Sequence, residues 1–591
     1  MNIFQEIQTQ VQQAFPTLFG NEVELNKITI NETPKDFIGD ITLVVFPLLK
    51  LTKKNPEESA KTIGEYLVAN NKNIIAYNII KGFLNLEISN EYWINFAINP
   101  TSEIADHSSE TILIEYSSPN TNKPIHLGHM RNNVLGYALA GIFKANNYKV
   151  VKANLVNDRG IHICKSMIAW QKFGNGETPE NTDMKGDKLV GKYYVEFDKH
   201  YKQQVADLVE QGKTKEEAEK QAPIMLEAQE MLLKWENNDA ETISLWTTMN
   251  NWVYAGFERT YKNLGVDFDK FYYESNTYLL GKDIVEDGLQ RNVFFKKEDG
   301  SVWIDLTADG LDQKLVLRAD GTSVYITQDL GTADLKYKDF KMDRSIYVVG
   351  NEQDYHFKVL KLILQKLGRP YADGIQHFSY GMVDLPSGKM KSREGTVVDA
   401  DDLIDDMLES AKEQTEALGK IDDFTEDEKT ALFRTIGLGA LKFFLLRVDP
   451  KKRILFDPKE SIDLHGYTGP FVQYTYARSR SILRRVGEIS NLKSQISNLN
   501  YEASPAEIEL IKVLYKYEII VEESCKEMNP AKLIDYTYEV AKTYNKFYNE
   551  CPILAAEKEE QKNFRILLTE QTGNTIKKCF EIVGIEVPER M

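Results

Sequence analysis

One stretch of the chain, residues 111–156, constrains the fold more than any other. Residues 111–116 form an apolar run typical of a buried strand, and residues 127–146 have the apolar periodicity of a helix. Residues 148–156 resemble a second buried strand. Parallel strands joined by a helix need a crossover, which is right-handed in nearly all proteins. The sequence therefore predicts an α/β domain with a doubly wound parallel sheet.

The turn between the first strand and the helix has the sequence PNTNKPIHLGH. In doubly wound sheets, ligands bind beyond the carboxyl ends of the strands, where this turn lies. A helix N-terminus favours an anion, and His126 and His129 lie on one face of the helix start. Gly128 between them lets a flat ring approach the backbone. The turn therefore predicts a phosphate site, with two surface histidines as the alternative.

A basic loop, residues 388–395, follows a strand predicted at 378–383. Its sequence, GKMKSREG, places lysines and an arginine between glycines, which suits the charge of a phosphoryl group during transfer. A solvated basic loop is the alternative. Further strands are predicted at 323–327 and 345–349, and each ends in polar residues. These strand ends predict the rim of an active site.

The chain is too long for one hydrophobic core, since 591 residues imply about two to four domains. Residues 1–100 have the pattern of a small α+β domain. Residues 101–460 predict the parallel-sheet domain, with a helical insertion at about 165–290 and connecting helices over 401–460. Residues 461–591 predict an all-helical domain.

Composition narrows the class of protein. No apolar run approaches the roughly 20 residues that span a bilayer, and the N-terminus has no targeting features. We therefore expect a cytoplasmic protein with no membrane partner. The four cysteines lack metal-ligand spacing, so we expect buried thiols and no structural metal. The net charge of −17 argues against a nucleic-acid partner, although a local basic patch can still bind one.

The turn and the basic loop together resemble the signatures of class I aminoacyl-tRNA synthetases. HLGH resembles their HIGH motif, and KMKSR resembles their KMSKS loop. From about residue 80 to the C-terminus, the chain resembles the arginyl-tRNA synthetase family in particular. The matching segments are EYSSPNTNKPIHLGHMRN, NLVNDRGIHICKSM, YITQDLGTADLKY, YVVGNEQDYHF, ALKFFLLRVDP, YTGPFVQYTYARSRSI and VPERM.

The resemblance implies an enzyme, an arginine–tRNA ligase. It would activate L-arginine with Mg²⁺-ATP to arginyl-adenylate and transfer the arginyl group to the 3′ end of tRNA(Arg), giving AMP and diphosphate. It also implies a Rossmann-like catalytic domain, a small N-terminal domain and an all-α anticodon-binding domain. The implied protein is a monomer, and its arginine activation requires bound tRNA.

The resemblance further assigns residues to the arginine substrate. A guanidinium presents five donors in a planar fork and is best met by carboxylates. Glu115 and Asp329 would face it, with Tyr325 beside them. Two structural carboxylates, capping or salt-bridged, are the alternative. The implied arginine-binding residues are Glu115, Ser118, Asn120, Tyr325, Asp329 and Gln353.

The arginine carboxylate is ionised at neutral pH, so attack on the ATP α-phosphate needs positioning and positive charge rather than a base. Ser392 stands where the KMSKS motif has its second lysine. The resemblance implies that Lys123 replaces that lysine, with Lys391 as the alternative. The implied ATP-binding residues are Pro119, Lys123, His126, Gly128, His129, Met382, Val383 and Lys389. The implied catalytic residues are Lys123, His126, His129, Lys389 and Lys391.

Two regions are expected to contact tRNA. In the C-terminal domain, Tyr476, Arg478 and Arg485 combine positive charge with an aromatic ring, as phosphates and unstacked bases require. Solvated arginines and a core tyrosine are the alternative. The N-terminal domain resembles the family's tRNA-elbow module, with Phe83 and Asn85 as candidates.

Three other functions compete with this one: another class I synthetase, a small nucleotidyltransferase, and a catalytically inactive tRNA-binding paralogue. A cysteinyl enzyme would carry zinc-ligand cysteines, which the sequence lacks. A small nucleotidyltransferase would not need the helical C-terminal domain. An inactive paralogue should have lost His126, His129 or the arginine-site residues, and all are present.

Overall fold

The computed structural model describes residues 2–100, 104–384, 398–417, 419, 421–487 and 501–591. Lys389 and Lys391 therefore lie outside the described residues. The chain forms two compact units, and its C-terminal helices are divided between them. The first unit comprises Met1–Glu103, Ser479–Glu518 and Glu539–Asn574. The second comprises Ile104–Arg478, Ile519–Tyr538 and Thr575–Met591.

The first unit contains an antiparallel sheet in the order β1-β2-β4-β3, as the predicted α+β domain requires. Helix α1 buries Ile3, Ile7, Val11 and Phe15 along one stripe, and the Asn2 side chain caps its first turn. The strands are β1 (Thr29–Glu32), β2 (Ile41–Val44), β3 (Ile74–Ile80) and β4 (Phe83–Ile88). The helices wholly in this unit are α1 (Ile3–Phe19), α2 (Leu49–Thr52), α3 (Pro56–Asn70), α4 (Asn90–Ile98) and α21 (Pro505–Tyr515).

The second unit is built on a five-stranded sheet in the order β12-β11-β5-β6-β7, and every neighbouring pair in it is parallel. Strand β5 comes first in the chain yet lies at the centre, so the strand order reverses beside it. Ligands bind at such a switch point, beyond the carboxyl ends of the strands. The predicted doubly wound fold is confirmed. The strands are β5 (Thr111–Glu115), β6 (Lys149–Val156), β7 (Lys270–Tyr273), β11 (Arg344–Gly350) and β12 (Ile375–Tyr380).

The strand predicted at 323–327 is wrong, because helix α14 begins at Tyr325. The local sequence SVYIT is rich in strand-forming residues. Ile326, Leu330 and Ala333 nevertheless lie four and three residues apart, and all three are buried. A helical face that packs into the core therefore outweighs the local preference.

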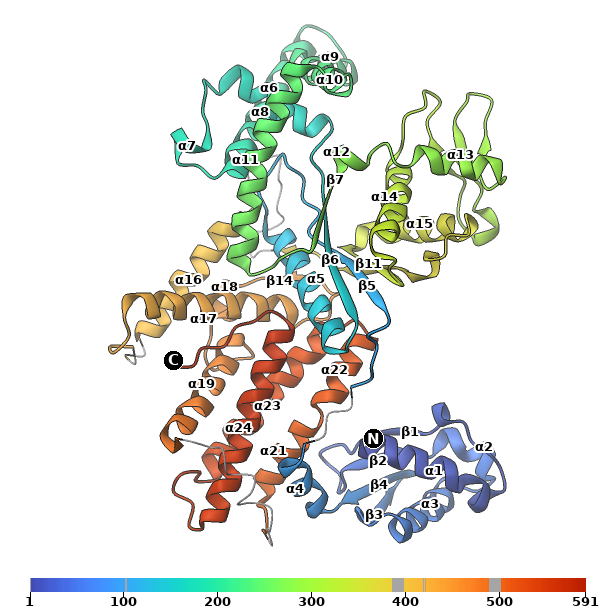
Figure 1. Ribbon diagram of the computed structural model, residues 1–591, viewed down its shortest axis with the longest axis vertical. Coiled ribbons are helices and arrows are strands. Elements are labelled where there is room, and N and C mark those ends of the chain that lie inside the picture. The colour runs from blue at the N-terminus through green and yellow to red at the C-terminus, as the bar shows by residue number, and fades with distance from the viewer. Residues whose placement is uncertain (1, 101–103, 385–397, 418, 420, 488–500) are drawn as a thin grey trace. The chain divides into compact units, whose positions relative to one another are not determined.

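Helices surround this sheet and extend from it (Figure 1). The insertion helices α6, α8, α10 and α11 pack on one another. The insertion was predicted to reach about residue 290, but β7 within that range pairs with β6 in the core sheet, so the insertion ends earlier. The helices are α5 (Leu127–Ala145), α6 (Ile161–Phe173), α7 (Pro179–Thr182), α8 (Gly186–Glu210), α9 (Lys215–Gln221), α10 (Pro223–Glu236), α11 (Ala240–Leu264), α12 (Glu274–Thr277), α13 (Lys282–Gln290), α14 (Tyr325–Phe340), α15 (Asp354–Lys366), α16 (Ala400–Ala417), α17 (Glu426–Leu446) and α18 (Pro458–Ser461).

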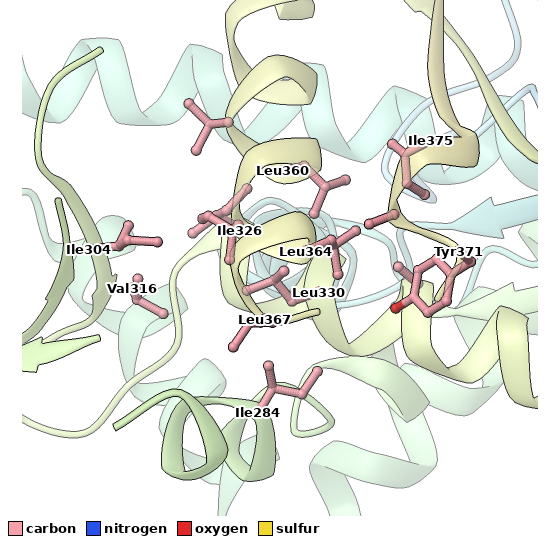
Figure 2. Close-up of a cluster of buried hydrophobic side chains, with 14 of the residues drawn as sticks. Ile284, Ile304, Val316, Ile326, Leu330, Leu360, Leu364, Leu367, Tyr371 and Ile375 are labelled. Atoms are coloured by element: carbon pink, nitrogen blue, oxygen red, sulfur yellow. The ribbon is translucent and has the colours of Figure 1, made fainter. Parts of the chain in front are cut away.

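One face of the sheet packs against α14 and α15 in a continuous hydrophobic cluster (Figure 2). Leu330 and Leu364 meet there, and Ile375 contributes from β12. A small antiparallel sheet adds Ile304 and Val316 to the same cluster. This cluster fixes α14 against the strands β5, β11 and β12. The remaining strands are β8 (Phe295–Lys296), β9 (Val302–Ile304), β10 (Lys314–Leu317), β13 (Val383–Asp384) and β14 (Ile454–Leu455).

In the C-terminal region, residues 461–487 and 501–591 contain helices and no strand, as predicted. Across the described part of the chain, no helix combines the length and apolarity needed to cross a membrane. Cys164, Cys525, Cys551 and Cys579 are buried free thiols, as predicted. The C-terminal helices are α19 (Gly469–Val486), α22 (Tyr517–Lys526), α23 (Pro530–Glu550) and α24 (Glu559–Ile582), in addition to α21.

Candidate active site

The chain leaves β5 through a strained turn. Ser117 and Ser118 have φ angles of 77° and 44°, which non-glycine residues rarely adopt. Two side-chain oxygens hold the turn: Asn132 Oδ1 accepts the Ser117 N–H at 2.5 Å, and Asn154 Oδ1 accepts the Ser118 N–H at 3.1 Å. Such strain concentrates at functional sites, where the surrounding structure holds it in place.

Helix α5 then begins with His126 as its N-cap. The Gly128 N–H donates to His126 Nδ1 at 3.1 Å, and the His126 N–H donates to His129 Nδ1 at 3.3 Å. A Cβ on Gly128 would lie 3.1 Å from the His126 ring, so glycine makes room for this arrangement. Both Nδ1 atoms are therefore acceptors. In a neutral imidazole that leaves the proton on Nε2, so both histidines present an Nε2–H donor.

Burial keeps both rings neutral. It lowers the pKa of His126 to about 3, with the nearby charge of Lys123 as the second cause. It lowers the pKa of His129 well below its usual value, again with smaller contributions from His126 and Lys123. Burial also lowers the pKa of Lys123. The turn therefore offers N–H donors to an anion, and its histidines carry no charge at neutral pH.

Backbone bonds fix the segments beside this turn. The Leu127 N–H donates to the Val398 carbonyl at 3.3 Å, and the Ala400 N–H donates to the Ile125 carbonyl at 2.9 Å. One turn along α5, the buried Arg131 donates to the Met382 carbonyl at 3.2 Å and to the Gly381 carbonyl. Met382 and Val383, both predicted ATP contacts, are thus held close to the HxGH helix.

The predicted guanidinium contacts lie on one face of α14 and at the end of β5. Tyr325 is 80% exposed at the first turn of α14, and Asp329 follows one turn later, half-buried. His356 Nε2 lies 2.5 Å from the Asp329 carboxylate. Glu115 is buried at the end of β5, where its Oε2 forms a close ion pair with Lys336. Both predicted carboxylates therefore have a partner within the protein.

The other predicted arginine contacts lie at the carboxyl ends of neighbouring strands. Ser118 is half-buried, and Asn120 is exposed after β5. Gln353 is exposed in a short 3-10 helix that directly follows β11. Pro119, a predicted ATP contact, is buried in the same turn, where its carbonyl accepts the Asn157 N–H at 2.9 Å. Since β5 and β11 are adjacent, their ends bring these residues to one edge of the sheet.

The predicted tRNA contacts differ in exposure. Phe83 is 40% exposed and packs edge-on against Phe46. Asn85 is buried and accepts the Thr42 hydroxyl at 2.6 Å. On α19, Tyr476 is 2% exposed and donates to Glu589 at 2.6 Å. Arg478 on the same helix is half-buried, whereas Arg485 is exposed. Burial therefore leaves Asn85 and Tyr476 little surface for a base.

Three residues escaped prediction although they contact predicted site residues: Arg131, Lys336 and His356. Lys336 and His356 lie within segments that carried the family resemblance, YITQDLGTADLKY and YVVGNEQDYHF. Lys336 stands seven residues after Asp329, two helical turns away on the same face. That spacing could have indicated from the sequence that Lys336 lies near the predicted arginine contacts. Arg131 also lies in a matching segment, EYSSPNTNKPIHLGHMRN, but its partners are backbone carbonyls from distant segments, so no sequence spacing pointed to them.

Three family models match the chain. Residues 5–88 match the arginyl tRNA synthetase N terminal domain, residues 96–457 the catalytic domain described as tRNA synthetases class I (R), and residues 472–591 the DALR anticodon binding domain. The chain is 54% identical over 597 residues to the arginine–tRNA ligase of Bacteroides fragilis and 52% identical over 608 residues to that of Flavobacterium psychrophilum. Each alignment covers 100% of both proteins.

Solved structures share the fold. The arginyl-tRNA synthetase of Thermus thermophilus is similar with a TM-score of 0.81 and 23% identity, over 100% of both chains. That of Plasmodium falciparum has a TM-score of 0.77 and 20% identity, over 100% of this chain and 99% of the other.

A parallel sheet whose central strand leads into an HxGH turn, matched by the class I catalytic model, defines a class I aminoacyl-tRNA synthetase. The full-length identities are more specific. The chain belongs to the arginyl-tRNA synthetase family, and its function is the ATP-dependent ligation of arginine to tRNA. None of these findings favours an inactive tRNA-binding paralogue.

Proposed function

We propose that the HxGH turn binds ATP through neutral donors. His126 and His129 each present an Nε2–H, and the N-terminus of α5 adds its partial positive charge. The acceptor role of both Nδ1 atoms is the observation that carries this proposal. Pro119 and Gly128 shape the turn, and Met382 and Val383 flank the adenosine side.

Lys123 supplies positive charge to the α-phosphate as the arginine carboxylate attacks it. Its half-buried ammonium lies close enough to both histidines to lower their pKa values, which supports a position at the same phosphate group. A charge in a partly desolvated site acts more strongly than the same charge in water. Lys389 and Lys391 complete the proposed catalytic set but lie outside the described residues.

The arginine side chain enters between Glu115 and Asp329, with Tyr325 against one face of the guanidinium. Asp329 accepts from the guanidinium in place of His356. Ser118, Asn120 and Gln353 hold the α-amino and carboxylate groups. Glu115 ends β5 and Gln353 follows the adjacent strand β11, which supports this assignment.

Two further parts of the chain serve tRNA. We assign residues 1–100 to the tRNA elbow, with Phe83 as the exposed contact and Asn85 as its buried support. Residues 461–591 bind the anticodon, with Arg478 and Arg485 on α19 toward phosphates and Tyr476 as packing beneath them. Residues 101–460 hold the catalytic site.

ATP enters as its Mg²⁺ complex. The groups of the HxGH turn are hydrogen-bond donors, whereas Mg²⁺ needs oxygen ligands, so the triphosphate itself would hold the ion.

We propose a cytoplasmic monomer, consistent with substrates found in that compartment. Light scattering at micromolar concentration tests the monomer, and a mass of twice 67.8 kDa would contradict it.

Pyrophosphate exchange with arginine, lysine or cysteine, each with and without tRNA, tests the proposed activity. We expect exchange with arginine only, and only with tRNA present.

Asp329→Asn should raise the arginine KM by roughly 10- to 100-fold, because a charge-assisted contact is lost. The exposed Asp312→Asn serves as the matched control. Exchange with arginine without tRNA would refute the tRNA requirement, and an unchanged KM in Asp329→Asn would refute the pocket.

A further inference from the structure

One face of α14 becomes steadily more buried along the helix. Tyr325, Asp329 and Lys336 are spaced four and seven residues apart, so they project from the same side. Tyr325 is 80% exposed, Asp329 is half-buried, and Lys336 is 1% exposed. The first two are proposed arginine contacts. The third, Lys336, is buried further along the same face.

Lys336 meets two strand-end residues at once. Its ammonium forms a close ion pair with Glu115 Oε2 and lies 4.4 Å from the centre of the Tyr347 ring. Glu115 and Tyr347 are register partners on the adjacent parallel strands β5 and β11. The ammonium therefore sits directly behind the carboxylate that is proposed to face the guanidinium.

A buried ion pair of this kind needs an explanation other than stability. Removing two charges from water costs about as much as their attraction returns, and apolar replacements of similar volume are often equally stable. Leaving one member alone is far worse, because an unpaired buried carboxylate takes up a proton. Without Lys336, Glu115 would be such a group, since its side chain is only 7% exposed.

The charges of Glu115, Asp329 and Lys336 together match a guanidinium. Glu115 and Asp329 together carry two negative charges, and Lys336 compensates one of them. The remaining single negative charge equals the positive charge of one guanidinium. Glu274 adds less than a full charge near neutral pH, because burial raises its pKa to about 7.

We propose that Lys336 is a positioning residue for arginine recognition: it keeps Glu115 ionised and turns one carboxylate oxygen toward itself, leaving the other for the guanidinium. This inference rests on the proposed role of Glu115 in arginine binding. Around the pair, the other titratable groups are Asp329 on α14, Tyr347 on β11 and Tyr272 on β7.

The test is the pH profile of the arginine KM for Lys336→Met, measured by pyrophosphate exchange with tRNA from pH 6 to 8.5. Loss of the ammonium leaves a buried carboxylate without a partner for its charge, which favours the neutral carboxyl most strongly at low pH. We expect the KM to be roughly 10- to 100-fold above the parent at pH 6.5 and to fall with rising pH. The ATP KM should stay within about 3-fold, since the change is confined to the arginine pocket.

Lys338→Met is the matched control, because Lys338 lies exposed on the same helix. It reveals any pH dependence that comes from Glu274 or from the assay. Lys336→Arg keeps the charge and should restore the profile of the parent. A Lys336→Met profile that parallels that of Lys338→Met would overturn the proposal.

Two variants at Glu115 separate this inference from the function on which it rests. Glu115→Gln should raise the arginine KM at every pH, and an unchanged KM would refute the role of Glu115 itself. In Glu115→Gln/Lys336→Met both buried charges are gone, so the protein should fold even if Lys336→Met does not. Its KM should match that of Glu115→Gln within about 3-fold, because Lys336 acts only through Glu115. A further rise would overturn the proposal.

Discussion

The HxGH turn and the proposed guanidinium pocket lie at the same edge of the sheet but differ in their electrostatics. At the turn, burial holds His126 and His129 neutral, and backbone N–H groups orient them. In the proposed pocket, Glu115 and Asp329 each have a partner within the protein. One region therefore offers neutral donors, and the other offers carboxylates that already have a partner within the protein.

The ligands proposed for the two regions account for this difference. A triphosphate brings several negative charges with its own Mg²⁺, so preorganised neutral donors bind it without tight coupling to pH. A guanidinium brings one positive charge in a fixed plane, which ionised carboxylates in fixed orientations match best. Lys336 contacts Glu115 and His356 contacts Asp329, and these contacts fix the orientation of the two carboxylates. The two regions limit the free-energy cost of burying charged side chains in different ways. The histidines of the turn are neutral, whereas the carboxylates of the proposed pocket have partners within the protein.

His126→Asn should have the largest effect and tests whether the turn works through its Nε2–H donor. Asparagine is a good N-cap and can accept the Gly128 N–H, so the helix start is kept. Only the donor toward the phosphate is lost. We expect arginine-dependent pyrophosphate exchange to fall by roughly 10²- to 10³-fold, with the arginine KM within about 3-fold.

The exposed His465→Asn provides the matched control and should leave exchange unchanged. If His126→Asn raised the arginine KM as strongly as it lowered exchange, the two regions would not be separable. The contrast between them would then be lost.

Lys123→Ala should have the next largest effect, because it removes the one charged side chain assigned to the phosphate side among the described residues. We expect exchange to fall by roughly 10²-fold, as loss of a phosphate-clamping charge should. Lys144→Ala, exposed at the other end of α5, is the control. Unchanged exchange in Lys123→Ala would show that Lys123 does not replace the missing KMSKS lysine.

The strand–turn–helix core of the site could be predicted from the sequence, because its periodicity is local. Strand β5, helix α5 and strand β6 begin within a residue of prediction. Helix α14 could not be predicted, since SVYIT favours a strand and only burial of Ile326 and Leu330 decides otherwise.

The electrostatics of the site were beyond prediction for a related reason. The neutrality of His126 depends on how deeply it is buried, and the partner of Glu115 comes from a helix more than 200 residues later. The sequence supplied Lys336 within a matching segment, but only the register of β5 with β11 places Glu115 and Tyr347 together at its ammonium. An ion pair between residues of different helices and strands can be predicted only when the arrangement of the sheet is known.

The smallest expected effect is on stability and tests the neutral histidines directly. In the folded protein the pKa of His126 is about 3, whereas an unfolded histidine titrates near 6.5. The unfolded state therefore takes up more protons as the pH falls below about 6.5, and the fold loses stability there. Between pH 7.5 and 5.5 this contribution is about 1 kcal/mol for one histidine, or a few degrees in Tm at most. His126→Asn should lose correspondingly less Tm on acidification than His465→Asn. Equal losses in the two variants would mean that His126 is charged in the folded state and that the phosphate side uses the same electrostatic design as the pocket.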